Sequence, residues 1–163
     1  EVMRPAVPPR KGEHGIIVEG LSNCLVKFSK CCSPVPGDDI VGFITRGYGV
    51  SVHRADCPNV LRSRDNPAEA GRWIRVSWAD KTSEEYHTML QVVAKDRISL
   101  IMDVSTVLSA TKTRVLSLNA RSTPDGFALL DLGISVSGRE QLKTVTSRLE
   151  QIQGVMKVTR PAG

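Results

Sequence analysis

The sequence is poor in aromatic residues and lacks long apolar segments. Phe, Trp and Tyr make up only 4% of its 163 residues, so we expect a core built mainly from aliphatic side chains. No apolar run approaches the roughly 18 residues that a membrane-spanning helix needs. The first residues also lack the apolar stretch of a secretory signal peptide. We therefore expect a cytoplasmic protein with no membrane partner, and the absence of an initial Met is typical of a piece of a longer chain.

Several motifs that accompany catalysis or nucleotide binding are also absent. The sequence contains no Walker phosphate-binding loop, no dinucleotide-binding glycine fingerprint and no Ser/His/Asp arrangement. Asp38 and Asp39 form a carboxylate pair, but they lie in a Pro-Gly turn, where a structural role is expected. The net charge of +5 is spread over both halves, and it permits contact with RNA without establishing it. The chain itself is therefore predicted not to be an enzyme.

The first half is predicted to contain short strands separated by turns. Alternating or apolar segments predict strands at 15–19, 24–28, 40–45, 50–53 and 73–78. Residues 46–49 form a Gly-rich hairpin turn, residues 34–39 form a loop, and residues 57–64 are expected to form a short helix. The region 1–15, which is rich in Pro, Arg, Lys and Gly, is predicted to be a linker or disordered tail. A small β-rich domain is thus expected over residues 16–79.

The second half has a clearer periodic pattern. After a polar linker at 80–85, alternation predicts strands around 90–94, 116–120, 128–136 and 155–158. Apolar residues at helical spacing predict helices over 100–108 and 142–152, with Asp96 near the positive start of the first helix. The resulting order is βαββαβ, the ferredoxin-like arrangement, over residues 86–163. The whole chain is therefore assigned to the α+β class.

Four potential metal ligands lie in the first half: Cys31, Cys32, His53 and Cys57. A tetrahedral zinc site uses about four nitrogen or sulfur ligands, and His53 and Cys57 can approach one ion from a single turn. Neighbouring residues of an extended chain point to opposite sides, so a bend after Cys32 would be needed. Spacing alone leaves two interpretations open, a zinc site or small buried thiols. Cys24, at a strand position, is expected in the core.

The central stretch resembles a known family. Residues 31–39 read CCSPVPGDD and residues 44–59 read ITRGYGVSVHRADCPN. This pattern is similar to the C-terminal regulatory region of long RelA/SpoT-family proteins, which synthesise and often hydrolyse the alarmone (p)ppGpp in the stringent response. The resemblance implies a zinc-finger-like RIS domain followed by an ACT domain. It also implies GTP pyrophosphokinase domains upstream, which this chain lacks and would regulate.

The resemblance further implies partners and site residues. The positions of Cys31, Cys32, His53 and Cys57 correspond to a cluster linked to zinc in the family. The same module contacts ribosomal RNA when uncharged tRNA occupies the ribosomal A site, whereas DNA is not expected as a partner. Basic and aromatic residues suited to phosphate contact and base stacking are therefore candidate RNA contacts: Lys30, Arg46, Tyr48 and Arg54. The 46–49 hairpin is expected to place its charge and its aromatic ring beside the metal turn. From composition alone, an ordinary solvated surface is favoured.

The ACT half implies a small-molecule site and a homodimer. ACT domains that bind amino acids usually carry glycine in the first strand-to-helix turn, but here the turn is Asp96, Arg97, Ile98, Ser99 and Leu100. Serine hinders approach of a ligand carboxylate to the backbone amides, although its hydroxyl can cap a helix. Weak binding of a branched-chain amino acid, or none, is expected. The alternative hypothesis is a stand-alone amino-acid-sensing ACT regulator whose first domain is only structural.

Overall fold

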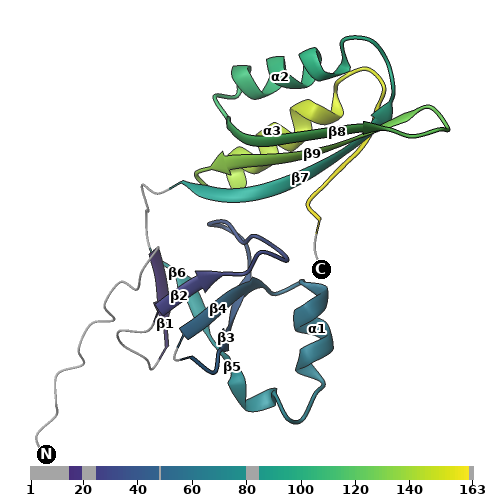
Figure 1. The fold of residues 1–163 in the computed structure, drawn as a ribbon. Helices are drawn as coiled ribbons and strands as arrows, with labels where there is room; N and C mark the ends of the chain where they lie inside the picture. Colours follow the sequence, from purple (N-terminus) through teal and green to yellow (C-terminus); the bar gives the residue numbers. More distant parts are fainter. Residues whose placement is uncertain (1–14, 20–24, 48, 80–84, 162–163) are drawn as a thin grey trace, which may run out of the picture.

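A computed structural model gives the fold, and it describes residues 15–19, 25–47, 49–79 and 85–161. These residues form two α+β units, one after the other along the chain (Figure 1). The first unit contains β1 (Ile16–Val18), β2 (Leu25–Phe28), β3 (Ile40–Ile44), β4 (Gly49–Arg54), α1 (Pro58–Arg64), the 3-10 helix η2 (Ala70–Arg72), β5 (Trp73–Ile74) and β6 (Val76–Trp78). The second contains β7 (Tyr86–Lys95), α2 (Leu100–Ala110), β8 (Arg114–Ser122), β9 (Phe127–Val136), α3 (Arg139–Glu150) and β10 (Val155–Thr159).

The first unit has one four-stranded sheet and one two-stranded sheet. The larger sheet has the order β2-β4-β3-β5, in which β2 and β4 are parallel, and the smaller one pairs β1 with β6. The single strand expected over 73–78 is therefore divided, because β5 pairs with β3 and β6 pairs with β1. Gly42 on β3 makes room for this crossing, since an added Cβ would lie 2.8 Å from a methyl group of Val76. The core is aliphatic, as the scarcity of aromatic residues predicts.

The second unit confirms the predicted βαββαβ order. Its sheet has the order β10-β7-β9-β8, and every neighbouring pair is antiparallel. Figure 1 shows α2 and α3 on the same face of this sheet. The helices pack on the alternating apolar residues of β7 and β9, which are buried together with Val104, Leu142, Val145 and Leu149. The helix α2 begins at Leu100, so Asp96 precedes its first turn and accepts a hydrogen bond from Ser122 instead.

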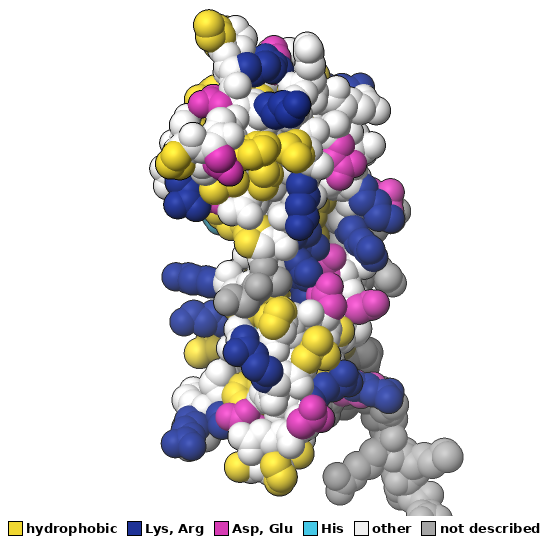
Figure 2. Space-filling view, turned by 90° about the vertical axis from the view of Figure 1, so that its right-hand side faces the viewer, with side chains coloured by type: hydrophobic (Ala, Val, Ile, Leu, Met, Phe, Trp, Pro, Cys, Tyr) yellow, Lys and Arg dark blue, Asp and Glu magenta, His cyan; other side chains and the backbone are white. Residues whose placement is uncertain are grey.

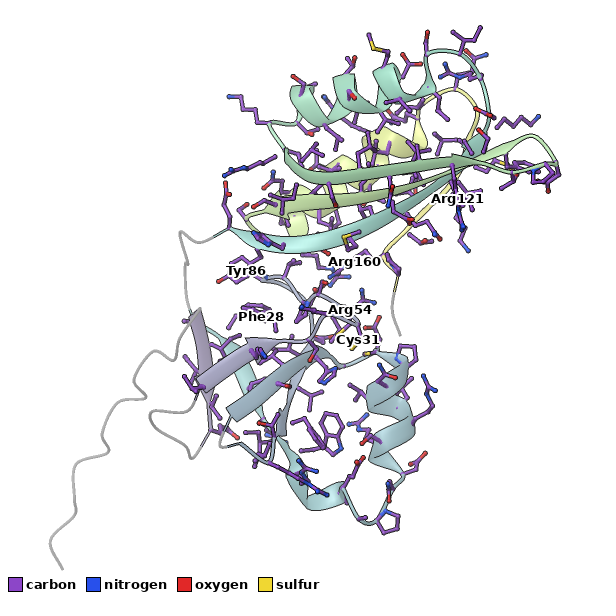
Figure 3. The ribbon with its side chains drawn as sticks, in the orientation of Figure 1. Phe28, Cys31, Arg54, Tyr86, Arg121 and Arg160 are labelled. Carbon is purple, nitrogen blue, oxygen red and sulfur yellow. The ribbon has the colours of Figure 1, made fainter. Side chains whose placement is uncertain are left out.

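The two units meet through the loop that follows the adjacent cysteines. Val35 in this loop is fully buried and belongs to the apolar core of the second unit. The backbone N–H of Arg139 donates to the carbonyl of Pro36, and Gly37 has φ +100° where an added Cβ would clash with Arg139. Phe28, Trp78 and Tyr86 pack together at the same junction, with ring centroids 5.6–5.8 Å apart (Figure 3). The two units therefore share a packed interface.

Parts of the expected organisation cannot be compared with the structure. The tail predicted at 1–15 and the linker predicted at 80–85 lie almost entirely outside the described residues, as does Cys24. Within the described part of the chain, no helix is both long enough and apolar enough to cross a membrane.

Candidate metal centre

The four predicted metal ligands come together at one end of the first sheet. The thiol and imidazole ligand atoms of Cys31, Cys32, His53 and Cys57 all lie within 4.8 Å of one another. Cys31 Sγ is 3.4 Å from His53 Nδ1 and 3.6 Å from Cys57 Sγ, and Cys32 Sγ is 3.8 Å from His53 Nδ1. A tetrahedral zinc ion with ordinary Zn–S and Zn–N bond lengths separates its ligand atoms by about 3.4–3.8 Å. The donor set and the spacing therefore fit one zinc ion.

Three local features place the four candidate ligands. Cys31 and Cys32 lie in the turn after β2, and Ser33, with φ 44°, supplies the bend that the sequence required. His53 lies near the end of β4. Cys57 is the residue before α1, and Pro58 at the first helical position has the fixed φ that suits a helix start. The cluster therefore joins a turn, a strand and a helix start.

The surroundings of the cluster adjust the charge of its members. Burial raises the pKa of Cys32 to about 12, although its sulfur accepts a hydrogen bond from the backbone N–H of Arg54 at 3.3 Å. Burial also raises the pKa of Cys57, but hydrogen bonds from the amides of Asn59 and Val60 and from neighbouring thiols outweigh it, so the net direction is downward. Burial lowers the pKa of His53, which favours the neutral imidazole that binds metals. Cys57 is therefore better prepared than Cys32 to become a thiolate.

An ion pair closes the turn between the last two ligands. The guanidinium of Arg54 donates to both carboxylate oxygens of Asp56, at 2.9 and 3.0 Å. These hydrogen bonds lower the pKa of Asp56, so the carboxylate stays charged. Trp73 packs edge-on against His53, with ring centroids 6.0 Å apart. Both contacts restrict the orientation of His53 and Cys57.

The predicted RNA-binding residues do not form one patch. We expected the 46–49 hairpin beside the metal turn, but the pairing of β3 with β4 puts Arg46 at the opposite end of β4 from His53. A strand of this length separates the two ends by roughly 15–20 Å. Lys30 and Arg46 are exposed, whereas the Arg54 side chain is only 12% exposed, and Tyr48 lies outside the described residues. Figure 2 shows Lys and Arg side chains dispersed among acidic ones over both units.

The predicted amino-acid site lies beside a small cleft of the second unit. Asp96, Arg97, Ser99 and Leu100 line a cleft of about 330 Å³, while Ile98 is 93% exposed and does not line it. Ser99 has φ 69°, the left-handed conformation that favours glycine, and its side chain makes no capping hydrogen bond. Arg97 is held by Asp103 at 2.6 Å and by the carbonyl of Gln153. Ser99 therefore has the backbone conformation of a glycine, but unlike glycine it adds a side chain to the lining of the cleft.

Asp38 and Arg160 form an ion pair between the two units that the sequence did not predict. Arg160 donates to both carboxylate oxygens of Asp38, at 2.9 and 3.0 Å, and to the carbonyl of Ser33 at 2.8 Å. Asp38 also accepts the backbone N–H of Val35, which confirms its predicted turn role. No sequence pattern connects Asp38 with Arg160, which lies 122 residues further along the chain.

Comparison with known families identifies both units. Residues 16–79 match the RelA/SpoT RIS domain, and residues 82–160 match the ACT domain. The chain therefore combines a RelA/SpoT RIS domain with an ACT domain. The RIS domain thus contains the Cys/His cluster, and the ACT domain is the βαββαβ unit that packs against its 33–38 loop.

Relatives with curated names support this assignment. The chain is 38% identical over 149 residues to a GTP pyrophosphokinase of Escherichia coli, which covers 91% of this chain and 20% of that protein. It is 36% identical over 160 residues to the bifunctional (p)ppGpp synthase/hydrolase RelA of Mycobacterium tuberculosis, covering 96% and 21% respectively. The RIS–ACT chain therefore spans about a fifth of the length of these relatives. Among solved structures, the ACT domain from a GTP pyrophosphokinase of Chlorobium tepidum is 23% identical, with a TM-score of 0.43, and covers 47% of this chain and 99% of that one.

Proposed function

We propose that this chain is the regulatory C-terminal region of a cytoplasmic GTP pyrophosphokinase, and that it controls catalytic domains elsewhere in the same protein. The observation that carries the proposal is the succession of a RIS domain and an ACT domain, in the order of the matching relatives, over about a fifth of their length. In this proposal the chain performs no chemistry. It binds a partner, and the change between its free and bound states regulates the (p)ppGpp-synthesising domains.

Zinc has a structural role in this proposal. Cys31, Cys32, His53 and Cys57 would hold the ion, which would join the turn after β2 to β4 and to the start of α1. A bound structural zinc ion adds its binding free energy to the stability of the folded state. The RIS domain needs such a contribution because its apolar cores are small. The core cluster at the site has only three buried residues, Cys32, Cys57 and Val60, and two of these are proposed ligands.

The partner we propose for the RIS domain is ribosomal RNA at a tRNA-loaded A site. Lys30 and Arg46 support this proposal because both are exposed and neither has an ion-pair partner among the described residues. They lie at opposite ends of β4, so they would contact phosphates at separate points of an RNA surface. Each phosphate contact that is lost should reduce the salt dependence of binding by about one unit of slope.

Co-sedimentation of the chain with ribosomes tests this partner. The informative variant is Lys30→Gln with Arg46→Gln, because Arg54 is largely buried and its loss would disturb the turn that carries two metal ligands. The matched control is Lys95→Gln with Arg148→Gln, which removes the same charge from exposed positions of the ACT domain. We expect weaker, less salt-sensitive binding only for the first variant. Equal ribosome binding by both variants would show that Lys30 and Arg46 do not contact the RNA.

A second candidate function is amino-acid sensing by the ACT domain. The glycine-like backbone of Ser99, beside the 330 Å³ cleft, favours it. A branched-chain amino acid would direct its carboxylate to the amides at the start of α2, where the helix end is partly positive. Calorimetry with valine, isoleucine and leucine distinguishes the two functions. Binding of one of them with retained ribosome binding would assign both functions to the chain.

A further inference from the structure

A second, larger cleft lies between the RIS and ACT domains. It encloses about 800 Å³ and is lined from the RIS side by the 38–39 turn and residues 54–56, and from the ACT side by one face of α3 and the end of β10. Its floor includes the buried apolar residues Leu90, Leu142 and Val158. Small-molecule sites commonly have volumes of about 300–1,000 Å³ with an apolar lining and a few convergent polar groups. The cleft therefore has the size of a ligand site, with an apolar floor and mostly polar or charged walls.

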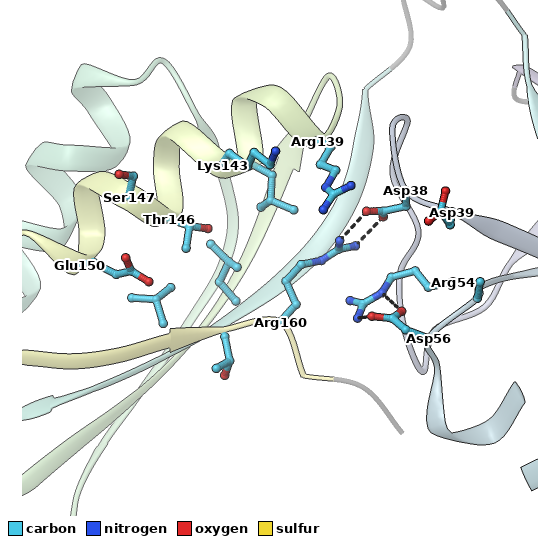
Figure 4. Close-up of a pocket in the computed structure, with 15 residues that line it drawn as sticks. Asp38, Asp39, Arg54, Asp56, Arg139, Lys143, Thr146, Ser147, Glu150 and Arg160 are labelled. Carbon is cyan, nitrogen blue, oxygen red and sulfur yellow. Dashed lines mark hydrogen bonds and ion pairs between the residues drawn. The ribbon is translucent and has the colours of Figure 1, made fainter. Parts of the chain in front are cut away.

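Two buried guanidinium nitrogens in this cleft have no hydrogen-bond partner. Arg54 Nη1 and Arg160 Nε are both buried and unpaired, although the remaining donors of each side chain bind Asp56, Asp38 or a carbonyl. Buried polar atoms are nearly always satisfied, so such atoms call for an acceptor. Figure 4 draws both guanidinium groups at the end of the cleft where Arg139 approaches from α3. Because these groups can only donate, the missing partner must be an acceptor.

Two further cations in the cleft are not neutralised. Arg139 and Lys143 are one turn apart on α3, both line the cleft, and neither forms an ion pair with any described residue. The carboxylates of Asp38 and Asp56 are already paired with Arg160 and Arg54.

Two carboxylates remain in the lining, Asp39 beside the paired Asp38 and Glu150 at the far end of α3. Carboxylates accept hydrogen bonds from hydroxyl groups. The lining thus combines cations and unpaired donors at one end with acceptors for hydroxyl groups elsewhere.

We propose that this inter-domain cleft binds a small phosphate-bearing molecule that also carries hydroxyl groups. Its phosphate is neutralised by Arg139 and Lys143. It accepts hydrogen bonds from the unpaired nitrogens of Arg54 and Arg160 once these side chains turn toward the cleft, because neither nitrogen is accessible in the empty cleft. Phosphate suits this end of the cleft because it offers acceptor oxygens in several directions, toward cations from two domains. The concave, partly apolar shape favours a small molecule over an RNA backbone, which would need an open basic groove.

Calorimetry of the zinc-supplemented chain with inorganic pyrophosphate, and separately with ADP, tests the proposal at low salt. We expect one site per chain with a dissociation constant below about 1 mM for each ligand. The double variant Arg139→Gln, Lys143→Gln should weaken binding at least tenfold. The control Arg148→Gln, Lys157→Gln removes the same charge from exposed positions of α3 and β10 that do not line the cleft, and it should leave affinity within twofold. Circular dichroism verifies that both variants remain folded.

Three outcomes would overturn the proposal. Absence of saturable binding would mean that water satisfies the two guanidinium nitrogens. If citrate bound as tightly as pyrophosphate, the cleft would be a site for carboxylate-bearing ligands and not one specific for phosphate. An RNA oligonucleotide that depends on Arg139 and Lys143, without pyrophosphate binding, would make the cleft part of an RNA surface. The ribosome assay with the Lys30 and Arg46 variant is independent of these results, so the two proposals can fail separately.

Discussion

Ser99 holds a backbone conformation that its side chain disfavours. Its φ of 69° lies in the left-handed region, which costs a residue with a Cβ roughly 1–2 kcal/mol relative to the right-handed region. A serine at this position could recover part of the cost by capping the helix, but Ser99 makes no such hydrogen bond. The conformation is therefore imposed by the turn between β7 and α2.

Ser99→Gly should therefore stabilise the chain. Glycine adopts this conformation without strain, and we expect the free energy of unfolding to rise by about 1 kcal/mol after the larger unfolded-state entropy of glycine is included. Urea unfolding followed by circular dichroism measures the change. Ser105→Gly is the matched control, because Ser105 is an exposed interior residue of α2, where glycine should destabilise by a similar amount. If Ser99→Gly destabilised the chain as Ser105→Gly does, Ser99 would not be strained.

Cys57→Ser should abolish stable zinc binding. Cys57 is one of the four proposed ligands and is fully buried at the start of α1, so no other described side chain can replace it. We expect zinc content to fall from about one ion per chain to less than a fifth, with a lower melting temperature, because metal binding is coupled to folding. Metal analysis after purification without chelator measures the content. Cys24→Ser is the control, and loss of zinc in that variant would contradict the proposed ligand set.

At the scale of elements, periodicity predicted the strands and helices well, but it could not predict how they pair. The apolar pattern of 128–136 and the helical spacing after 100 depend on local contacts, and both elements formed. The division of 73–78 between two sheets depends on the space that Gly42 leaves on β3, which no local pattern reveals. The wrong expectation that Arg46 lies beside the metal turn has the same origin, because it required the register of β3 with β4.

The outer strand of the ACT sheet is exposed along its whole length. All nine residues of β8 are exposed, including Val115, Leu116 and Leu118, although β8 pairs on one side with β9. Directly paired residues share a face, so Leu118 beside the buried Leu132 faces the helix side without being covered. An open apolar edge strand is prone to pair with another chain. The edge thus supports the homodimer that the family resemblance implies for the ACT domain.

The chain should dimerise through β8, and Leu118→Glu should prevent it. Antiparallel pairing of two β8 strands about Leu118 would bring the two copies of the substituted carboxylate together, which is unfavourable. Light scattering at high protein concentration should give a dimer mass for the natural sequence and a monomer mass for the variant. Thr144→Glu, an exposed change on α3, is the control and should remain dimeric. A natural chain that is monomeric at all concentrations would exclude the dimer.

At the scale of the whole molecule, the contact between domains is what the sequence did not reveal. The CCSPVPGDD motif predicted metal ligands and a turn, but the same loop also inserts Val35 into the ACT core and binds Arg160 through Asp38. The residues that complete the interface are Arg160, directly after β10, and Arg139 at the start of α3, more than a hundred positions further along the chain. The loop directly follows two of the proposed metal ligands, so it connects the candidate metal centre with the ACT domain.

Loss of Arg160 should lower the stability of the folded chain and let its two domains unfold separately. Asp38 is only 9% exposed, and removing one member of a buried ion pair leaves the other charge uncompensated, at a cost of roughly 3 kcal/mol. Both tryptophans lie in the RIS domain, and Trp78 also contacts Tyr86 of the ACT domain. Fluorescence therefore reports the RIS domain and the junction, while circular dichroism reports both domains. In urea, the natural chain should give coincident transitions by the two methods. Arg160→Met should lower the midpoint and separate the transitions.

The control and the double variant decide whether the ion pair itself is responsible. Arg148→Met removes an exposed arginine of α3 and should change the free energy of unfolding by less than about 0.5 kcal/mol. Asp38→Asn combined with Arg160→Met should be more stable than the sum of the single changes predicts, because the double variant leaves no isolated buried charge, whereas each single change leaves one. Strict additivity, or coincident transitions in Arg160→Met, would mean that the packing of Val35 and the aromatic cluster holds the domains together without the ion pair. A retained joint transition that separates only on chelation would place the coupling in the metal-bearing loop instead.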